Sequence, residues 1–458
     1  MDVSPTPLLR IATEIANIVN KVNGRALVVG GFVRDAFLCE VSKDLDIEVY
    51  GLTEEQLLAA LTPKFSLDLV GRAFGIFKVK GYPIDISLPR RERKTGSKHT
   101  DFDVTVDPFL TVKEAAERRD FTMNAISFDP LTREYIDPFN GLADIKQGRL
   151  HPTSERFKED PLRVLRGMQF ISRFNLYPSA LTLEYSQELS QEGLASERLF
   201  EEWNKMILRG KDIHGGLLYL AVTGWIRFYP ELQAMGTCQQ DPVWHPEGSV
   251  WVHTCHCMNA FAEDKSGYTD EENLVIGYAT LLHDAGKPKV TEFRDGHWRA
   301  HAHNAAGVEP ARAFMLRLTN QEDLIKQVTE YVREHMSADD IFDHSKSDNA
   351  VRRLATRVNS LQQLGRVMRY DKRGRPPIDS TVCPSVDWLY ERAEILRVAN
   401  EKPKPLVKGR HLIELGRTPG KDFGPILDDL FEMQLDGKFS TLEEGLVELK
   451  KKLNVCQS

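Results

Sequence analysis

The stretch ALVVGGFVRDAFLCEVSKDLDIEVYG, residues 26–51, decides the fold of this chain. Its first apolar run ends at Gly30-Gly31, which predicts a buried strand followed by a tight turn, and the next residues have helical spacing. From Asp44 to Val49, acidic and apolar residues alternate. A strand there would carry three acids on one face and three apolar side chains on the other.

Asp44 and Asp46 are the acids that predict chemistry. Two carboxylates at this spacing can hold Mg²⁺ ions, which prefer oxygen ligands and substrate phosphates, and two metals about 4 Å apart can activate a hydroxyl and stabilise a leaving phosphate. The glycine turn before the helix would let backbone N–H groups approach a triphosphate. Taken alone, an Asp-x-Asp pair favours an amphipathic edge strand whose acids face water.

The residues that precede the Asp-x-Asp pair favour a metal site over a solvated edge strand. Gly-Gly-x-Val-Arg-Asp at residues 30–35, followed by Asp-x-Asp, resembles the nucleotidyltransferase signature of the polymerase-β superfamily, in its tRNA nucleotidyltransferase and bacterial poly(A) polymerase branch. The resemblance implies that Asp44 and Asp46 bind catalytic Mg²⁺. It also implies that three residues of the first motif seat the triphosphate: Gly30, Gly31 and Arg34.

Asp85 matches the position of a third acid in relatives of this family. It lies in one of two predicted strands, residues 74–79 and 84–88, that follow a predicted helix at residues 53–61. A solvated acid near a strand edge is an equally good interpretation of Asp85.

Composition is that of a globular protein of two to four domains, with 458 residues of which 41% are hydrophobic and 28% charged. No apolar run could span a membrane, and the first residues lack the basic start of a signal peptide. The six cysteines show no zinc-type spacing and are expected to remain reduced thiols in a cytoplasm.

A net charge of −7 argues against a general nucleic-acid coat protein, but a local basic stripe could bind RNA. Its members are Arg90, Arg91, Arg93, Lys94 and Lys98.

The residues from Arg90 to Thr105 are polar, basic and glycine-containing, which predicts a mobile loop. Further on, residues 117–125 read ERRDFTMNA and resemble the family motif that contacts the sugar and phosphates of the incoming nucleotide. Guanidinium groups suit phosphate oxygens, so Arg119 would bind phosphates, while Asp120 and Asn124 can bond hydroxyls.

Residues 159–166, EDPLRVLR, predict a helix start with Asp160 and Arg163 three positions apart, so that their side chains can meet. A carboxylate beside a guanidinium matches the amino group and ring nitrogen shared by adenine and cytosine, and mismatches guanine and uracil. In the family that this segment resembles, it is the protein template for the base, and Arg166 belongs to the same motif. Ser196-Glu197-Arg198 resembles a motif that supports the template helix.

From residue 241 the chain becomes rich in histidine. His283 and Asp284 end a predicted buried helix, and adjacent imidazole and carboxylate groups suit a divalent transition metal such as Ni²⁺, Mn²⁺ or Co²⁺. The segment resembles an HD phosphohydrolase domain, whose ligand pattern matches His253, His283, Asp284 and Asp371. His303 and His335 resemble further ligands or phosphate contacts. A His–Asp pair bonded across a helical core is the alternative.

These resemblances imply an α+β chain, with a polymerase-β-type head of small mixed sheet and helices at residues 1–150. An all-α neck (151–238), an HD body (239–375) and a helical tail with a possible tRNA contact (376–458) would follow. The implied activity is template-independent addition of CMP and AMP, from CTP and ATP, to the 3′ end of tRNA or another RNA. Three alternatives stay open: an A-adding enzyme or poly(A) polymerase, an HD phosphohydrolase with the head as nucleotide sensor, and a nonenzymatic RNA-binding module. Sequence does not give the oligomeric state.

Overall fold

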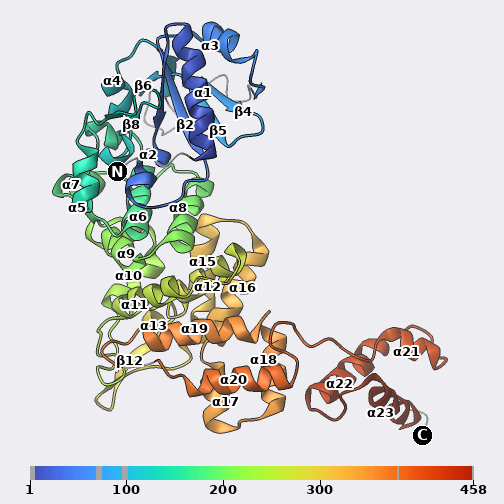
Figure 1. Ribbon diagram of the computed structural model, residues 1–458. Helices are drawn as coiled ribbons and strands as arrows, with labels where there is room; N and C mark the ends of the chain where they lie inside the picture. The colour runs from blue at the N-terminus through green and yellow to red at the C-terminus, as the bar shows by residue number, and fades with distance from the viewer. Residues whose placement is uncertain (1–5, 69–74, 95–101, 379–380, 456–458) are drawn as a thin grey trace. The chain divides into compact units, whose positions relative to one another are not determined.

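The computed structural model describes residues 6–68, 75–94, 102–378 and 381–455 (Figure 1). The chain forms two compact units, residues 1–228 and 229–458. The α+β class is confirmed, while the finer division into head, neck, body and tail stays a prediction. No helix in the described ranges is both long and apolar enough to cross a membrane.

The first unit is built around a seven-stranded mixed sheet in the order β3-β4-β5-β2-β1-β8-β9. Strand β2 (Leu45–Tyr50) pairs antiparallel with β1 (Arg25–Val29) and parallel with β5 (Ile84–Ser87). The other strands are β3 (Leu67–Asp68), β4 (Ile76–Val79), β8 (Ser127–Phe128) and β9 (Tyr135–Ile136). Because β2 has a neighbour on each side, the interpretation of its acids as an edge-strand feature is wrong.

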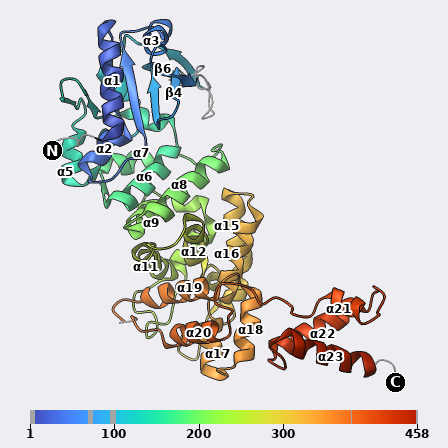
Figure 2. The ribbon, with the colours of Figure 1, turned by 45° about the vertical axis from the view of Figure 1, so that its right-hand side comes forward.

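Alternating side chains give the sheet two different faces. On one face Val28 and Ile47 share a core with apolar residues of helix α1 (Pro7–Lys21), which lies along the sheet in Figures 1 and 2. On the other face Leu27 and Tyr50 pack with Ala115 of α4 (Val112–Glu117). Since side chains alternate along a strand, the acids of β2 lie on this second face, beside α4. The remaining elements of this region are α2 (Gly31–Phe37), α3 (Glu54–Leu61), the 3₁₀ turn η2 (Thr122–Asn124) and α5 (Gly141–Gln147).

The predicted loop after Arg90 contains a β-hairpin, so that prediction was wrong for most of its length. Strands β6 (Arg90–Lys94) and β7 (Phe102–Val106) pair antiparallel, with Arg90 opposite Val106. Phenylalanine, valine and threonine in β7 favour a pleated strand, and this partner overrides the polar character of β6. Lys98 of the basic stripe lies outside the described residues.

Helices follow the sheet in the first unit. A short two-stranded parallel sheet of β10 (Arg149–Leu150) and β11 (Tyr177–Pro178) lies at the start of this helical region. Its helical elements are η3 (Glu155–Glu159), α6 (Leu162–Phe174), α7 (Ala180–Gln187), α8 (Ser196–Arg209), α9 (Ile213–Val222) and η4 (Trp225–Phe228).

Where the structure describes the second unit, the chain is helical except for one hairpin, which the sequence did not predict. Strands β12 (Thr291–Arg294) and β13 (His297–Ala300) are joined by Asp295-Gly296, both at positive φ, as a tight two-residue turn requires. The main helices of this unit are α10 (Pro230–Thr237), α11 (Val250–Glu263), α12 (Asp270–Leu282), α13 (Lys287–Val290), α14 (His303–Ala306), α15 (Val308–Leu318), α16 (Glu322–Glu334), α17 (Ser337–His344), α18 (Asp348–Arg357), α19 (Leu361–Arg373) and α20 (Pro384–Ile395).

Three last helices share a small apolar cluster that contains Leu412, Leu430 and Leu449. They are α21 (Gly409–Glu414), α22 (Phe423–Leu435) and α23 (Leu442–Val455).

Candidate functional site

Three acids gather at one end of the paired strands β2 and β5. Asp46 on β2 lies directly opposite Asp85 on β5, and Asp44 immediately precedes β2. Asp85 also forms a 3.6 Å surface ion pair with Lys78 of β4. The pairing of two parallel strands thus brings together acids that are some 40 positions apart in the sequence.

The electrostatics of this cluster suit a cation. Although the Asp46 residue is open to solvent, partial desolvation of its carboxylate raises its pKa to about 6. Arg119 opposes this shift, while the carboxylates of Asp44, Asp85 and Glu48 add to it. These carboxylates repel one another, and together they form a set of oxygen ligands. A hard divalent cation bound among them would reduce the repulsion.

Gly30 lies where the glycine turn meets this cluster. Its backbone, with φ +71° and ψ −133°, is a conformation open to glycine only. A Cβ at this position would lie 3.2 Å from Arg119 Nη1 and 3.4 Å from Asp46 Oδ2. The turn, the first motif and the ERRD motif therefore converge at one point, with Gly31 beginning α2 directly after it.

Glu48 is a member of this region whose role the sequence did not reveal. It is only 1% exposed, and its carboxylate accepts a 2.6 Å hydrogen bond from the Tyr50 hydroxyl. Arg118 donates to the same carboxylate at 3.2 Å, and Arg119 Nη2 lies 3.9 Å away. The third acid of the alternating stretch therefore anchors the two arginines rather than facing a ligand. The alternation of Glu48 with apolar residues was the sequence signal that placed it on the same face of the strand as Asp44 and Asp46.

Several residues of the first and second motifs bind each other. Arg34 is buried, bonds Asp35 at 2.6 Å and donates to the side-chain oxygen of Asn124 at 2.8 Å. Asn124 in turn donates to Asp120 at 2.8 Å. Arg34 also stacks on Phe170 of α6, about 5.0 Å from the ring centroid. The predicted phosphate contact through Arg34 stays a prediction, because its guanidinium already has these protein partners.

Asp120 joins this network to the helices α6 and α8. Its second oxygen accepts a 2.7 Å hydrogen bond from Arg166, and Arg166 lies 4.0 Å from the buried Glu202 of α8. Burial would raise the pKa of Asp120, but Arg166 and the Asn124 amide hold it at about 2. Asp120 is therefore ionised at neutral pH and locks the ERRD motif to α6.

The predicted contact between the side chains of Asp160 and Arg163 is wrong. Asp160 accepts from the Leu162 N–H, the first of α6, at 3.1 Å, and its other oxygen accepts from Arg198 at 2.8 Å. Arg163 instead donates to the backbone carbonyls of Arg118, at 2.6 Å, and Arg156. Each side chain is fixed by its own partners, because the backbone turns before the helix begins.

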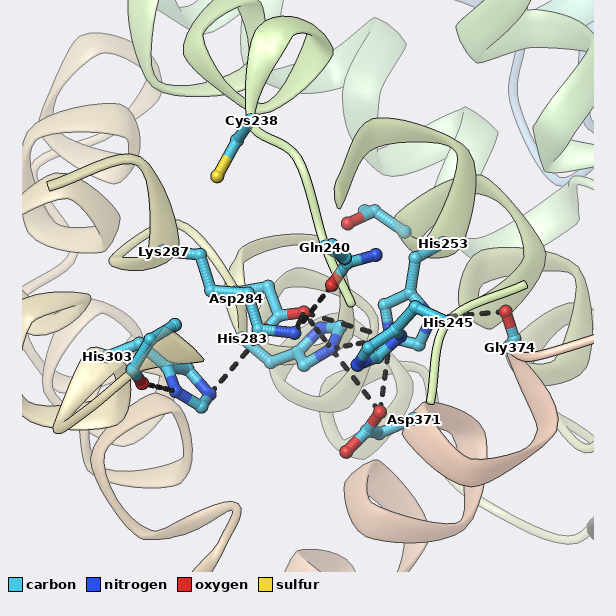
Figure 3. Close-up of polar contacts among 12 residues, drawn as sticks. Cys238, Gln240, His245, His253, His283, Asp284, Lys287, His303, Asp371 and Gly374 are labelled. Atoms are coloured by element: carbon cyan, nitrogen blue, oxygen red, sulfur yellow. Dashed lines mark hydrogen bonds and ion pairs between the residues drawn. The ribbon is translucent and has the colours of Figure 1, made fainter. Parts of the chain in front are cut away.

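The second unit contains a cluster of buried histidines and acids (Figure 3). His253 comes from α11, His283 and Asp284 directly follow α12, and Asp371 lies near the end of α19. The structure thus brings together the four residues of the predicted HD pattern. Two further histidines join them: His303 and His335.

Hydrogen bonds at Nδ1 fix the orientation of the four histidine rings. His283, His303 and His335 each donate Nδ1–H to a backbone carbonyl at 2.7–2.9 Å, while His253 Nδ1 bonds Glu247 at 2.8 Å and the Gly374 carbonyl at 3.1 Å. Backbone carbonyls and the ionised carboxylate of Glu247 can only accept hydrogen bonds. In a neutral ring, Nδ1 therefore carries the proton and Nε2 carries a lone pair. Such backing is typical of metal-binding histidines.

The Nε2 atoms turn toward each other in pairs. His253 and His283 approach to 3.4 Å, and His303 and His335 to 3.2 Å. Burial and the neighbouring His283 and His303 lower the pKa of His335 to about 3, so its ring is neutral at physiological pH. A neutral His335 ring with its proton on Nδ1 directs a lone pair on Nε2 toward His303.

Two acids complete the cluster. Asp371 Oδ1 lies 3.1 Å from His253 Nε2, and Asp284 lies 3.4 Å from His283 and 3.3 Å from His303. Burial raises the pKa of Asp284, but Lys287, with Nζ 2.7 Å from Oδ2, and His283 bring it well below its usual value. The acids are therefore charged, and the donor set fits a divalent transition metal. The thiol of Cys257 lies 3.3 Å from His253 Nε2.

A cavity of about 290 Å³ opens beside these groups. Asp284, His303 and Asp371 line it on one side. Its other lining side chains include three cations and two indoles: Lys287, Arg299, Arg375, Trp244 and Trp298. A cavity with this lining suits an anionic ligand that carries a flat ring.

Comparison with known proteins gives this arrangement a context. Residues 26–151 match the family model of the poly A polymerase head domain. The chain is 31% identical to the multifunctional CCA protein of Xanthomonas campestris pv. campestris (strain B100), over 78% of this chain and 87% of the relative. It is also 31% identical to the multifunctional CCA protein of Stenotrophomonas maltophilia (strain K279a), over 79% of this chain and 89% of the relative.

Solved structures resemble the whole chain. The Bacillus stearothermophilus CCA-adding enzyme in complex with CTP superposes with a TM-score of 0.66 at 19% identity, and 99% of each chain is covered. The Thermotoga maritima CCA-adding enzyme complexed with tRNA-CCA gives a TM-score of 0.61 at 21% identity, again over 99% of each chain.

Proposed function

Because this chain belongs to the class II CCA-adding enzyme family, which includes the multifunctional CCA proteins, we propose that it adds CMP and AMP to the 3′ end of tRNA. CTP and ATP are the donors, and no nucleic-acid template is needed. The RNA terminal oxygen forms a bond to the α-phosphorus of the nucleotide, and the bond from that phosphorus to pyrophosphate breaks.

The observation that carries this proposal is the acid cluster beside the glycine turn. Asp46 and Asp85 face each other across paired strands, Asp44 lies next to them, and Arg119 approaches from the ERRD motif. We propose that the three acids hold divalent cations, with Mg²⁺ as the expected ion. Such ions lower the pKa of an attacking hydroxyl and neutralise charge on the phosphates.

The chain's own groups orient the nucleotide in this proposal. Gly30 leaves room for a triphosphate beside Asp46, since a side chain there would meet Arg119. Arg119 supplies the guanidinium for phosphate oxygens, because its bond to the Asn124 carbonyl, at 3.2 Å, leaves further N–H groups. The network of Asp120, Asn124 and Arg34 keeps this arginine in place.

Base choice is assigned to Asp160 and Arg163 acting as separately fixed groups. Arg198 and the α6 N–H hold Asp160, and two carbonyls hold Arg163, so neither side chain needs to reorganise when a base binds. A carboxylate acceptor and a guanidinium donor would accept adenine or cytosine and leave guanine or uracil with unpaired polar groups.

The test offers the purified protein three tRNAs that end before the first C, after C and after CC. Each is incubated with single and mixed triphosphates, and the product ends are sequenced. We expect C addition to the first two and A addition to the third. Runs of A on every substrate would instead identify a poly(A) polymerase, and addition of A alone an A-adding enzyme.

Asp46→Asn provides the matching test of the site. It keeps the shape of the side chain but removes a metal ligand charge, and we expect loss of addition by at least about 10³-fold with tRNA binding retained. Glu14→Gln is the control, since it removes a charge from an exposed pair with Lys64. Full activity of Asp46→Asn would remove the transferase assignment and favour a head that only senses nucleotides.

A second activity is favoured by the histidine cluster and its cationic cavity. We propose that residues 239–375 hydrolyse phosphate esters in the presence of Ni²⁺, Mn²⁺ or Co²⁺. Water oxygen would bond to phosphorus, the ester bond would break, and the leaving oxygen would take a proton. His283→Ala should abolish metal-dependent phosphoesterase activity and leave nucleotide addition intact. Absence of hydrolysis by the unaltered protein with all three metals would make this body structural.

A further inference from the structure

The lining of the cavity contains two tryptophans from segments that are far apart in the sequence. Trp244 lies between α10 and α11, and Trp298 lies on β13. We propose that these two indoles bind the base of a nucleoside phosphate, so that the hairpin β12–β13 selects which phosphate esters enter the cavity. This inference rests on the phosphate-ester hydrolase proposed above, and it adds the part of the ligand that is not the phosphate.

Asp241 fixes the position of both tryptophans. Its buried Oδ2 lies 2.7 Å from Nδ1 of His297, the residue directly before Trp298 on β13. Its Oδ1 accepts from the Val243 N–H at 3.0 Å, and its carbonyl accepts from the Trp244 N–H at 3.1 Å. Asp241 therefore joins the turn that carries one indole to the strand that carries the other.

The hairpin itself holds Trp298 in place. Phe293 on β12 lies directly opposite Trp298 in the strand register, and their ring centroids are 5.1 Å apart with an interplanar angle of 59°. At the base of the hairpin, the Cys238 thiol lies 3.4 Å from the Thr291 hydroxyl, which donates to the Lys287 carbonyl at 2.7 Å. An indole held in this way loses little side-chain freedom when a ligand stacks on it.

Trp244 is far more exposed than the core tryptophans of this chain. It is 66% exposed, whereas Trp203 and Trp225 are fully buried. An indole that lines a cavity and keeps an open face can stack on a flat ring, and every base has such a face. A purine covers more of an indole than a pyrimidine does, so we expect adenine and guanine to bind more tightly than cytosine and uracil.

Two arginines of the cavity lining have N–H groups left for a phosphate. Arg299 follows Trp298 directly, and the ion pair described for it is a 3.7 Å contact with the exposed Asp295. Arg375 bonds Asp371 at 2.7 Å, but its buried Nε has no hydrogen-bond partner among the described residues. Guanidinium groups suit phosphate oxygens. The cavity volume of about 290 Å³ is at the lower end for ligand pockets, which suits a single nucleotide unit.

The test compares AMP with ribose 5-phosphate, which is the same ligand without its base. Binding of each to the full-length chain is measured by equilibrium dialysis without added metal, so that the result does not depend on hydrolysis. The nucleotide-addition site of the first unit contributes equally to the parent and to variants of the second unit. We expect the site in the second unit to bind AMP about tenfold more tightly than ribose 5-phosphate.

Trp298→Leu and Trp244→Leu should each weaken this AMP binding by about tenfold and leave ribose 5-phosphate binding unchanged. A misfolded hairpin would affect both ligands alike. Trp298→Phe keeps an aromatic ring and should recover most of the affinity for AMP. Trp388→Leu is the matched control, because this tryptophan of the same unit packs on Phe342 and does not line the cavity.

A free nucleotide and the terminal nucleotide of an RNA present the same base and phosphate, and competition separates these two sources. A single-stranded RNA with a 3′-phosphate is added to the parent chain loaded with AMP. Displacement of the fraction of AMP that Trp298→Leu fails to bind would identify an RNA end as the ligand. Retention of that fraction would identify a free nucleotide.

Equal affinity of the parent chain for AMP and ribose 5-phosphate, or unchanged AMP binding in both leucine variants, would overturn the base subsite. Hydrolysis of both esters with Mn²⁺ at the same KM, in the parent and in the variants, would also overturn it and would leave the hydrolase standing. The expected binding pattern without hydrolysis in Ni²⁺, Mn²⁺ or Co²⁺ would support the base subsite and remove the hydrolase.

Discussion

Removal of the buried charge at Glu48 is the sharpest test of how the first unit holds its site together. Glu48 accepts from Tyr50 at 2.6 Å and from Arg118 at 3.2 Å, with Arg119 3.9 Å away. Glu48→Gln keeps the size and an oxygen for the Tyr50 hydroxyl, but it leaves two guanidinium groups facing an uncharged amide.

The expected loss of unfolding free energy in Glu48→Gln depends on how far the two arginine side chains are exposed to water. Loss of one partner of a fully buried ion pair costs about 3–5 kcal/mol, and one charged hydrogen bond contributes about 1.5–3 kcal/mol. The side chains of Arg118 and Arg119 are 18% and 19% exposed, so water compensates in part. We expect a loss of about 2 kcal/mol, which corresponds to about 1 M in the urea midpoint of the first unit.

Function should change through Arg119, which reaches from Glu48 to the glycine turn. We expect KM for CTP to rise by about tenfold, or about 1.4 kcal/mol, with a smaller change in kcat. Glu40→Gln is the matched control, since its pair with Lys211 is exposed and contributes less than about 1 kcal/mol. An unchanged urea midpoint together with unchanged KM in Glu48→Gln would refute the anchoring role.

Two further predictions use contacts that hold the other motifs. Arg198→Ala should relax base choice, because it frees Asp160 from its 2.8 Å bond; incorporation of GMP and UMP relative to CMP should rise about tenfold, and unchanged ratios would contradict this. Gly286→Ala should destabilise the second unit by about 1–3 kcal/mol, because a Cβ would lie 2.0 Å from the His303 carbonyl oxygen. The control Gly236→Ala, whose Cβ meets nothing within 4 Å, should be neutral or stabilising in thermal unfolding; equal effects would contradict the packing argument.

Local patterns in the sequence predicted the elements of the first unit well. Alternation predicted β2, and a capping residue with helical spacing predicted α3, which begins with Thr53 and Gln56 in a capping box. These signals succeed because they depend on neighbours in the chain. The hairpin β6–β7 was missed because its polar first strand is stabilised by a partner strand whose paired residues lie 8 to 16 positions away, which the pattern within the first strand does not contain.

Local sequence patterns predicted the hydrogen-bond partners of side chains less well than they predicted helices and strands. Spacing of three along a helix predicted that Asp160 would meet Arg163, but Asp160 lies before the helix and binds Arg198 from α8. Glu247, which orients His253, gave no signal beyond an acid near histidines. Residue types and their order predicted which groups assemble, while the choice of partners depends on packing between helices distant in sequence.

The two sites differ in a way that bears on their chemistry. In the first unit, Arg34, Asp120 and Asn124 satisfy one another, so the groups around the acids are already fixed before a ligand arrives. That arrangement suits positioning of a nucleotide, where preorganised groups lose little entropy. In the second unit, the Nε2 atoms of His303 and His335 face each other at 3.2 Å beside the carboxylate of Asp284, and His303 and Asp284 both line the cavity. The Nδ1 bonds fix the orientation of these rings, and the two acids beside them already have cationic neighbours, with Lys287 2.7 Å from Asp284 and Arg375 2.7 Å from Asp371. The first site is therefore held by contacts that the chain makes to itself, and the second offers a set of donors that suits a cation.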